Sequence, residues 1–476
     1  MPAEGAIVRS GLAQRIASVL ERAAPSTSIF PVREQDRRLS GLDLFVLWGD
    51  LSVGLLVLVT GTLLVPALGF RTALVAILVG TVIGCVPLAL VGLAGAREGV
   101  PSMVLFRPVL GIRGSFVPSA LNLVQLLGWT AFEFWAMASI ANDVSRKLWH
   151  LDAYALWLVL VAAGCTSLAI GGPVVVVRRW LERFGVYVVL AVGAWITFKV
   201  VTAGGGLSAA WHRPATGGLA FWLGVDLVIA QPASWLPLVA DYNRYARRDA
   251  RSFAGTFAGY ALGNAWFYAL GAMLVLAAGA GPDVIGLGTS IAFLAGGSVV
   301  LIALLAGETD EAFADIYSWA VSAQNLWPRA PQRLLIGCVA VIATLLALVV
   351  TVGSFELFLF LIGSVFVPLF GVFSADYFVR GNARYDEREL FRPGGRYWFG
   401  NGIRWRAFAP WIAGIVVYHW CVPTGPSWWI DGVREVFASW LHLPFPLFGS
   451  ALGASLPSFA VAFGAALLFL GERSRT

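Results

Sequence analysis

The sequence predicts an all-α polytopic membrane protein with about twelve transmembrane helices. Three observations carry this prediction: the composition, the recurrence of long apolar stretches, and the one-sided placement of the basic residues. Of 476 residues, 58% are hydrophobic and only 13% are charged, and the mean hydropathy is +0.78. A soluble domain carries about 25% charged residues. The composition therefore excludes an ordinary soluble enzyme, a disordered protein and a disulfide scaffold.

The apolar stretches set the expected number of helices. A helix needs about 20 mostly apolar residues to cross the hydrocarbon core of a bilayer. We count twelve such segments: 42–66, 71–95, 116–141, 151–172, 184–203, 219–241, 254–280, 296–323, 333–353, 356–379, 408–424 and 446–471. A shorter apolar piece at 285–295 predicts an extracellular loop helix.

The basic residues support this count. With a cytoplasmic N-terminus, 27 of the 33 Lys and Arg residues fall on the inner side of the membrane, as the positive-inside rule requires. The net charge of +6 therefore reflects membrane topology, and nucleic-acid binding has no support. We expect both termini in the cytoplasm and the chain in the plasma membrane. No cleavable signal peptide is expected, because the first 40 residues are polar and arginine-rich.

Two of the predicted helices carry interruptions. The interrupting residues are Gly49 and Gly54 in the first segment and Pro232 and Pro237 in the sixth. Broken backbone is tolerated at membrane depth only where it is buried in protein or lines a cavity. We therefore expect discontinuities near Asp50–Gly54 and Gln231–Trp235, next to each other at mid-membrane. Broken helices five segments apart predict two five-helix repeats, the second inverted because five is odd. The alternative is that glycine and proline are simply common in membrane helices.

Acidic residues at bilayer depth are costly and are functional candidates. Seven acidic residues lie at bilayer depth, away from the segment ends: Asp50, Glu133, Asp226, Glu308, Asp310, Glu311 and Asp315. Glu308, Glu311 and Asp315 are spaced three and four apart and share one helix face. No Lys or Arg lies within the membrane to pair with them, so a bound cation, a proton or a cationic substrate is the natural complement. The alternative, for Glu308 above all, is an aqueous vestibule in which the carboxylate is merely hydrated.

Aromatic residues form the second functional pattern. Trp129 and Glu133 lie four residues apart, one turn along the same helix face. An indole beside a carboxylate suits a flat heterocycle, which can stack on one group and hydrogen-bond to the other. Trp235, beside the interruption of the sixth segment, is placed to face them. The alternative is core packing or an interfacial belt. The four cysteines and four histidines show no metal-binding or disulfide spacing, so they predict no metal site.

Five sequence patterns resemble the nucleobase–cation symporter-1 family. They are GVPSMVLFRPVLGIRGS (99–115), LNLVQLLGWTA (121–131), SWLPLVADYNRYAR (234–247), DIYSWAVSAQNL (315–326) and FGVFSADYFVR (370–380). They occur in this order over most of residues 40–380. Their amino-acid sequences are most similar to the cytosine or hydroxymethylpyrimidine permease branch of the family. The resemblance implies a leucine-transporter-like fold with twelve helices, a five-plus-five inverted repeat and alternating access to a central site.

The resemblance also implies roles for individual residues. A planar substrate would stack on Trp129 and hydrogen-bond to Glu133 one turn later. The remaining substrate-binding candidates are Gln231, Pro232, Ser234, Trp235, Asp315 and Gly54. The cation or coupling candidates are Asp50, Val53, Ala306, Thr309, Asp310 and Glu311, of which the first five match the family's sodium site.

Three departures from the family pattern change the expected chemistry. Glu133 stands where related members often carry Gln, Asp315 replaces an amide, and Asp310 replaces a hydroxyl of the ion site. A carboxylate can pair with the amidine edge of an aminopyrimidine or with a protonated ring. We therefore predict a secondary active transporter that imports a nucleobase-like heterocycle bearing an amino group or positive charge. Cytosine, an aminopyrimidine such as hydroxymethylpyrimidine, and purines are the candidate substrates. The symported cation is H⁺ or Na⁺, with protons favoured, and no cofactor other than a bound Na⁺ is expected.

These predictions divide the chain into five parts. The expected parts are a cytoplasmic segment (1–40), a ten-helix transport core (41–379), a basic cytoplasmic loop (380–407), two accessory helices (408–471) and a cytoplasmic tail (472–476). The alternatives to a transporter are a membrane enzyme and a passive channel. A polytopic membrane enzyme with an acid-rich site lacks a set of metal-ligating histidines, a GxSxG motif and a phosphate-binding motif. A passive channel lacks the repeated pore-lining segment of an oligomeric pore.

Overall fold

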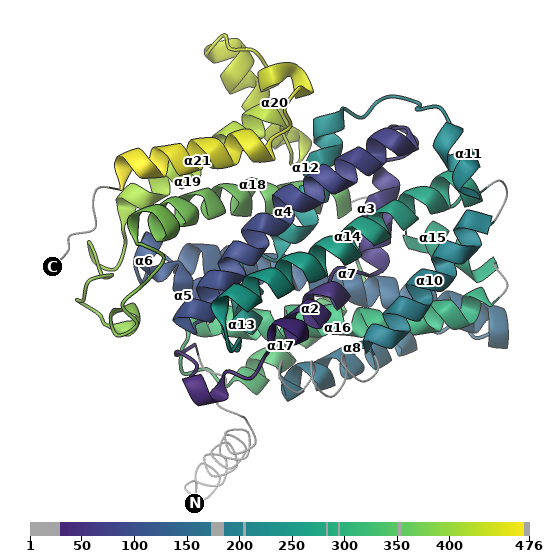
Figure 1. Cartoon of the computed structure of the whole chain (residues 1–476), viewed down its shortest axis with the longest axis horizontal. Coiled ribbons are helices and arrows are strands. Elements are labelled where there is room, and N and C mark those ends of the chain that lie inside the picture. The colour runs from purple at the N-terminus through teal and green to yellow at the C-terminus, as the bar shows by residue number, and fades with distance from the viewer. Residues whose placement is uncertain are drawn as a thin grey trace, which may run out of the picture.

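The computed structural model describes residues 29–172, 185–202, 206–281, 284–293, 296–350 and 355–470. Within these ranges the regular structure is helical, with two isolated β-bridges and no named strand, so the all-α class is confirmed (Figure 1). The α-helices are α2 (Gly41–Asp50), α3 (Leu55–Leu63), α4 (Phe70–Glu98), α5 (Ser102–Leu105), α6 (Arg107–Leu110), α7 (Phe116–Trp149), α8 (Tyr154–Gly171), α10 (Val186–Thr202), α11 (Gly206–His212), α12 (Phe221–Ser234), α13 (Val239–Asn243), α14 (Asp249–Ala278), α15 (Val284–Phe293), α16 (Gly297–Leu326), α17 (Gln332–Leu346), α18 (Phe355–Ser374), α19 (Trp405–Cys421), α20 (Ser427–Arg434) and α21 (Ser455–Phe469). Shorter 3₁₀ or π segments are η1 (Glu34–Asp36), η4 (Ala375–Arg380), η5 (Glu389–Phe391), η6 (Glu435–Trp440) and η7 (Leu447–Ser450).

Each of the twelve predicted segments contains a helix, and α15 matches the predicted loop helix. By length and apolar composition, five of the described helices can cross a membrane, or up to seven if each of two sharply bent pairs forms one span. Several of the others are shorter, such as α17 and α21 with 15 residues each. The chain is therefore a multi-pass membrane protein, and the count of twelve spans stays a prediction.

The first predicted segment is broken where the sequence suggested. Helix α2 ends at Asp50 and α3 begins at Leu55, with a bend of 60° between them. Gly54, the last unwound residue, has extended backbone angles of φ −162° and ψ 178°. This conformation is open to any residue, so the reason for glycine here must be the space around it rather than its backbone.

The sixth segment is also interrupted, but about one turn later than predicted. The predicted discontinuity near Gln231–Trp235 is confirmed, but it starts at the last residue of that range, because α12 runs through Pro232 and ends at Ser234, and α13 begins at Val239. Pro237 explains the position. It has no N–H to donate and disfavours helical backbone at the preceding residue. The chain therefore unwinds at 235–238, past the first proline and around the second.

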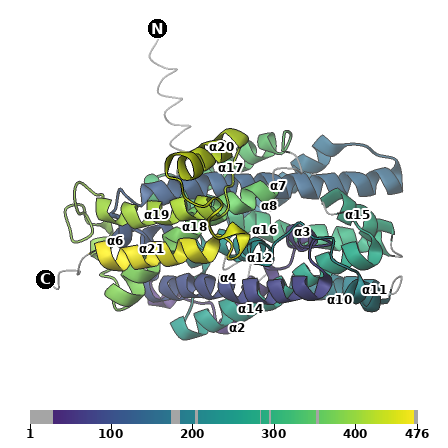
Figure 2. The same ribbon diagram turned by 90° about the horizontal axis from the view of Figure 1, so that it is seen from above.

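Glycines let α14 lie directly on the backbone of the broken first segment. On α14, Gly255, Gly259 and Gly263 recur every fourth residue, and a Cβ on any of them would collide with an atom of residues 41–52. Gly271 meets Leu58 of α3 in the same way. Small residues allow such close approach between membrane helices. Helices α2, α4 and α14 lie along one side of the molecule, and α7 and α8 lie along the opposite side (Figure 2).

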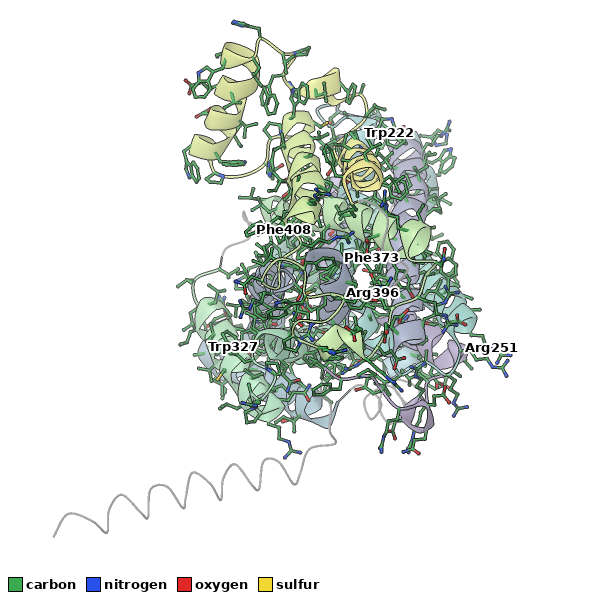
Figure 3. The ribbon with its side chains drawn as sticks, turned by 90° about the vertical axis from the view of Figure 1, so that its left-hand side faces the viewer. Trp222, Arg251, Trp327, Phe373, Arg396 and Phe408 are labelled. Carbon is green, nitrogen blue, oxygen red and sulfur yellow. The ribbon has the colours of Figure 1, made fainter. Side chains whose placement is uncertain are left out.

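Buried polar contacts attach the loop after α18 to the helices. Arg404 and Asp376 form an ion pair of 2.8 Å, and both side chains are buried. Tyr377 donates a hydrogen bond of 2.7 Å to Glu98 at the end of α4. Arg396 of this loop is labelled in Figure 3, which views the molecule from this end. The predicted basic loop therefore packs against the helical core, although its cytoplasmic location stays a prediction.

The structure gives Asp226 a structural role. Its two carboxylate oxygens accept the backbone N–H groups of Ala454 (2.6 Å) and Ser455 (3.1 Å) at the start of α21. The first N–H groups of a helix have no partner within the helix. Gly453 completes the arrangement, since it has a φ of +66° and a Cβ there would collide with the Asp226 carboxylate. Asp226 thus joins α12 of the core to the last helix of the chain.

We expect Asp226→Ala to destabilise the protein by about 1–2 kcal/mol, the usual cost of removing a helix cap. Asp226→Asn keeps one oxygen acceptor and should lose less. Thermal unfolding of the purified variants in one detergent measures both effects. Equal unfolding midpoints for Asp226→Ala and the parent protein would show that the contact does not hold α21.

Candidate substrate and cation site

Seven side chains from three neighbouring segments surround a small cavity beside the two helix breaks. They are Trp129 and Glu133 of α7, Gln231 and Ser234 of α12, Trp235 just after α12, and Glu311 and Asp315 of α16. Six of them are predicted substrate residues, whereas Glu311 was predicted to serve the cation. The cavity volume is about 10 Å³, which is room for about one water molecule. A heterocycle can enter only if the surrounding helices move apart.

On α7, two polar atoms face the cavity without a protein partner. The indole Nε1 of Trp129 and the Oε2 atom of Glu133 are buried and make no hydrogen bond. Behind the indole, Phe355 and Phe358 of α18 pack edge-on, with ring centroids 5.8 and 5.2 Å away. The aromatic contacts fix the orientation of Trp129, and the unpartnered atoms provide one donor and one acceptor for a ligand.

On α12, the last turn supplies a second polar wall. The Ser234 hydroxyl donates to the carbonyl of Gln231 at 2.6 Å, and Gln231 Oε1 has no partner. The next residue, Trp235, packs edge-on against Trp48 of α2, with ring centroids 5.7 Å apart. Trp48 itself donates to Asn243 of α13 at 2.8 Å. The two broken helices therefore meet at this aromatic contact, as the sequence predicted.

Three carboxyl groups converge on this cavity. Glu133 comes from α7, and Glu311 and Asp315 lie one turn apart on α16; all three are buried. None of the seven lining residues is Lys or Arg. Like charges at this spacing cannot all be ionised without a compensating cation or proton. The chemistry of the site therefore favours a ligand that donates hydrogen bonds or carries positive charge.

The break in the first segment faces the acidic face of α16. Glu308 accepts the backbone N–H of Leu55 at the start of α3. A Cβ on Gly54 would collide with the carboxylates of Glu308 and Glu311. The close approach of α16 therefore explains the glycine, and Glu308 is a helix cap, since a carboxylate is favourable at a helix N-terminus. This contact assigns to Glu308 a role other than hydration.

The predicted cation residues divide into two groups. The side chains of Asp50, at the end of α2, of Val53 and of Asp310 on α16 are buried, and the carboxyl groups of Asp50 and Asp310 lie within hydrogen-bonding reach of each other. Ala306, in contrast, is exposed. Thr309 is partly exposed, and its hydroxyl donates to the backbone carbonyl of Ala306 at 2.7 Å. A sodium site formed by these five residues stays a prediction.

The position of Pro232 also differs from the role expected for it. It does not line the cavity, and its ring instead packs against Gly84 of α4, where a Cβ would collide with it. Sequence reasoning missed Gln125, whose amide donates to the carbonyl of Ser234 at 2.6 Å. The signal was available, because Gln125 precedes Trp129 by one helical turn. Gln125 thus braces the break in the sixth segment from α7.

The fold and the site together describe a multi-pass helical membrane protein with a small, closed polar cavity beside two interrupted helices. A model of the family described as permease for cytosine/purines, uracil, thiamine, allantoin matches residues 31–439. The chain therefore belongs to this family of permeases, the nucleobase–cation symporter-1 family, as its sequence patterns indicated. Its relatives are transporters, so the alternative of a membrane enzyme is not supported.

Individual relatives agree with this assignment. The chain is 24% identical over 466 residues to the hydantoin permease of Microbacterium maritypicum, covering 90% of this chain and 92% of the relative. It is 25% identical over 403 residues to a putative purine-cytosine permease of Bacillus subtilis, covering 79% of this chain and 84% of the relative.

Solved structures confirm the fold. The closed conformation of the nucleobase–cation symporter Mhp1, with bromovinylhydantoin bound, has a TM-score of 0.76 at 21% identity and covers 93% of both chains. A Na⁺-coupled sialic acid symporter has a TM-score of 0.61 at 14% identity and covers 94% of both chains. The predicted leucine-transporter-like fold is therefore confirmed.

We expect Gly54→Ala to destabilise the protein by about 1–3 kcal/mol, because its Cβ would overpack the carboxylates of α16. Gly164→Ala is the matched control, since a Cβ there meets nothing within 4 Å. Shortening one neighbour, in Gly54→Ala with Glu311→Asp, should restore part of the loss. Thermal unfolding in detergent measures the series. If Gly54→Ala behaves like Gly164→Ala, α16 does not press on the break.

Proposed function

We propose that this protein is a cation-coupled importer of a nucleobase-like heterocycle that bears an amino group or a positive charge. The observation that carries the proposal is the convergence of Trp129, Glu133, Glu311 and Asp315 on one cavity that no Lys or Arg lines. The names of its relatives include hydantoin, purine-cytosine and allantoin permeases. A planar ring with several N–H groups is common to these compounds, and it suits an indole flanked by carboxylates.

The proposed binding mode assigns one role to each wall of the cavity. The ring stacks on the face of the Trp129 indole. Glu133 accepts from an amino group or from a protonated amidine edge, which offers two adjacent N–H donors. Asp315, one turn beyond Glu311 on α16, accepts from a further N–H group or balances a positive charge on the ring. The amide of Gln231 and the hydroxyl of Ser234 complete the polar edge.

Transport follows from the position of this cavity. It lies at the ends of broken helices, where small rotations of packed helices open a path to one side or the other. In the closed conformation the seven side chains leave room for about one water molecule. We propose that the chain works in the plasma membrane with both termini in the cytoplasm, because the basic residues gather on that side.

The proposed coupling ion is a proton, carried by the pair formed by Asp50 and Asp310. An ionised carboxylate only accepts hydrogen bonds, so a hydrogen bond between two carboxyl groups requires one of them to be protonated. The carboxyl groups of Asp50 and Asp310 lie within reach of such a bond between α2 and α16. Loss of the shared proton would place two negative charges in contact and separate the helices. Sodium is the alternative ion, with Asp50, Val53, Ala306, Thr309 and Asp310 as its ligands.

Substitutions in the cavity test the substrate assignment. We expect Trp129→Ala to weaken substrate binding by about 1–3 kcal/mol, the range found for base–aromatic stacking. Glu133→Gln should shift the preference from amino-bearing rings such as cytosine towards neutral rings such as hydantoin. The affinity of the purified protein for both compounds measures these effects, and it is determined from the rise in unfolding temperature that each ligand causes. Phe134→Leu is the matched control, because Phe134 is a buried residue of the same helix that does not line the cavity. If both cavity variants bind every ligand as the parent does, these residues only pack.

Asp310→Asn tests the coupling assignment. The variant should bind substrate but lose uptake driven by a pH gradient, because an amide cannot release a proton. Uptake of radiolabelled cytosine into proteoliposomes, in sodium-free buffer with an imposed pH gradient, measures this. Uptake that requires sodium and ignores the pH gradient would contradict the proton and make Asp310 a sodium ligand. Normal accumulation by Asp310→Asn under both gradients would remove Asp310 from coupling altogether.

A further inference from the structure

A second cavity, much larger than the first, lies between the transport core and the last helix. It has a volume of about 680 Å³ and is formed by α4, α12, α18 with η4, and α21. Its walls are almost entirely apolar. Several of its residues are strongly exposed, including Val82 of α4 (51%), Val379 of η4 (55%) and Leu456 of α21 (36%). The cavity is therefore a groove that opens sideways, towards the hydrocarbon of the bilayer.

One polar atom in this groove has no partner. The hydroxyl of Ser374, at the end of α18, is buried and makes no hydrogen bond, and the residue is only 7% exposed. Serines in membrane helices usually bond to a carbonyl of the preceding turn, as Ser364 does in the same helix. An unpartnered hydroxyl in an apolar groove indicates a ligand that is apolar over most of its length and carries an acceptor at one place.

Positively charged residues lie near the end of the groove that Ser374 lines. Phe378 and Val379 are lining residues, and Arg380 is the next residue along the chain. The Arg380 guanidinium also donates to the carbonyl of Leu467 near the end of α21, so it lies between the two helices that border the groove. Arg384, four residues later, is exposed. An anionic group beside this end of the groove would meet a guanidinium with several donors.

From this geometry we propose that the groove binds one phospholipid of the cytoplasmic leaflet. Its acyl chain lies along α4 and α12, an ester carbonyl accepts from Ser374, and its phosphate lies beside Arg380. Water-soluble ligands do not fit, because the apolar groove opens into the bilayer. The lipid would fill the space between the transport core and α21, the helix that Asp226 caps. The proposal does not depend on the proposed substrate or coupling ion.

The groove shares a wall with the substrate cavity. Ile229, Ala233 and Leu236 line the groove, whereas Gln231, Ser234 and Trp235 of the same stretch line the cavity. A bound acyl chain would therefore support the end of α12 from behind. This position gives the lipid a direct contact with the helix that unwinds at 235–238.

Native mass spectrometry of the full-length protein in a mild detergent, titrated with dioleoylphosphatidylglycerol, tests the proposal. We expect the parent protein to retain one lipid. Val86→Trp and Leu456→Trp place a large side chain in the groove and should weaken retention at least tenfold. Leu78→Trp is the matched control, because Leu78 is an exposed residue of α4 (52%) outside the groove. Size-exclusion profiles and unfolding midpoints identify any variant that fails to fold.

Two further variants test the polar end. Ser374→Ala and Arg380→Gln should each weaken retention several-fold, and Arg380→Gln should also reduce the preference for phosphatidylglycerol over phosphatidylcholine. Equal retention by Val86→Trp, Leu456→Trp and Leu78→Trp would overturn the proposal. A parent protein that retains no lipid would also overturn it. So would a parent protein that forms a dimer which Val86→Trp dissociates, since a second copy of the chain would then cover the groove.

Discussion

The unwound stretch between α2 and α3 depends on the hydrogen bond from the Leu55 N–H to Glu308 of α16. The hydrocarbon core offers no water to exposed backbone groups, so an N–H without a partner there costs several kcal/mol. A carboxylate satisfies this group and also lies at the positive end of the α3 dipole. Because Glu311 and Asp315 follow at successive turns of α16, the same contact sets how far these two carboxyl groups lie from the first break.

This dependence divides the helices into two groups. Helix α14 lies on the backbone of α2 and α3 through glycines, and glycines of α4 meet Val228 and Pro232 of α12 in the same way. On the other side, Asn325 of α16 donates to Ser115 and Ser119, before and within α7, at 3.0 and 2.9 Å. The substrate cavity lies between the groups, with α12 from the first and α7 and α16 from the second. Opening this cavity therefore requires the two groups of helices to separate where the carboxyl groups of α16 meet the first group. The close glycine contacts within the first group can stay intact.

Much of this arrangement was predictable from the sequence, because its signals are local. Gly54 and Pro237 mark backbone that cannot continue as regular helix in lipid, and Trp129 and Glu133 share a face by their spacing. The family resemblance then assigned α12 and α16 to the same cavity, which spacing alone could not do.

The features that were not predictable depend on contacts between distant residues. Pro232 could not be separated from Pro237 as the breaking residue, because a membrane helix tolerates a proline that packs well, as Pro232 does on Gly84. Asp226 looked like a candidate for transport and instead caps a helix more than 200 residues away. The orientation of Ala306 and Thr309 depends on the rotation of α16, which Glu308 sets.

The hydrogen-bonding groups of the cavity also constrain which edge of a substrate meets which helix. Carboxylates accept but do not donate, so Glu133 and Asp315 must face N–H groups of the ligand. Among the other lining side chains, the amide of Gln231 can donate to a ligand, whereas the Ser234 hydroxyl already donates to the carbonyl of Gln231. A ring with carbonyls on both sides of each N–H, as in an imide, would bring a carbonyl oxygen against a carboxylate. An aminopyrimidine places its amino group beside a ring nitrogen that can accept a proton, and once that nitrogen is protonated the edge presents two donors to one carboxylate. The replacement of an amide by Glu133 therefore favours an amidine edge, and protonation of that edge would neutralise part of the charge that three buried carboxyl groups create.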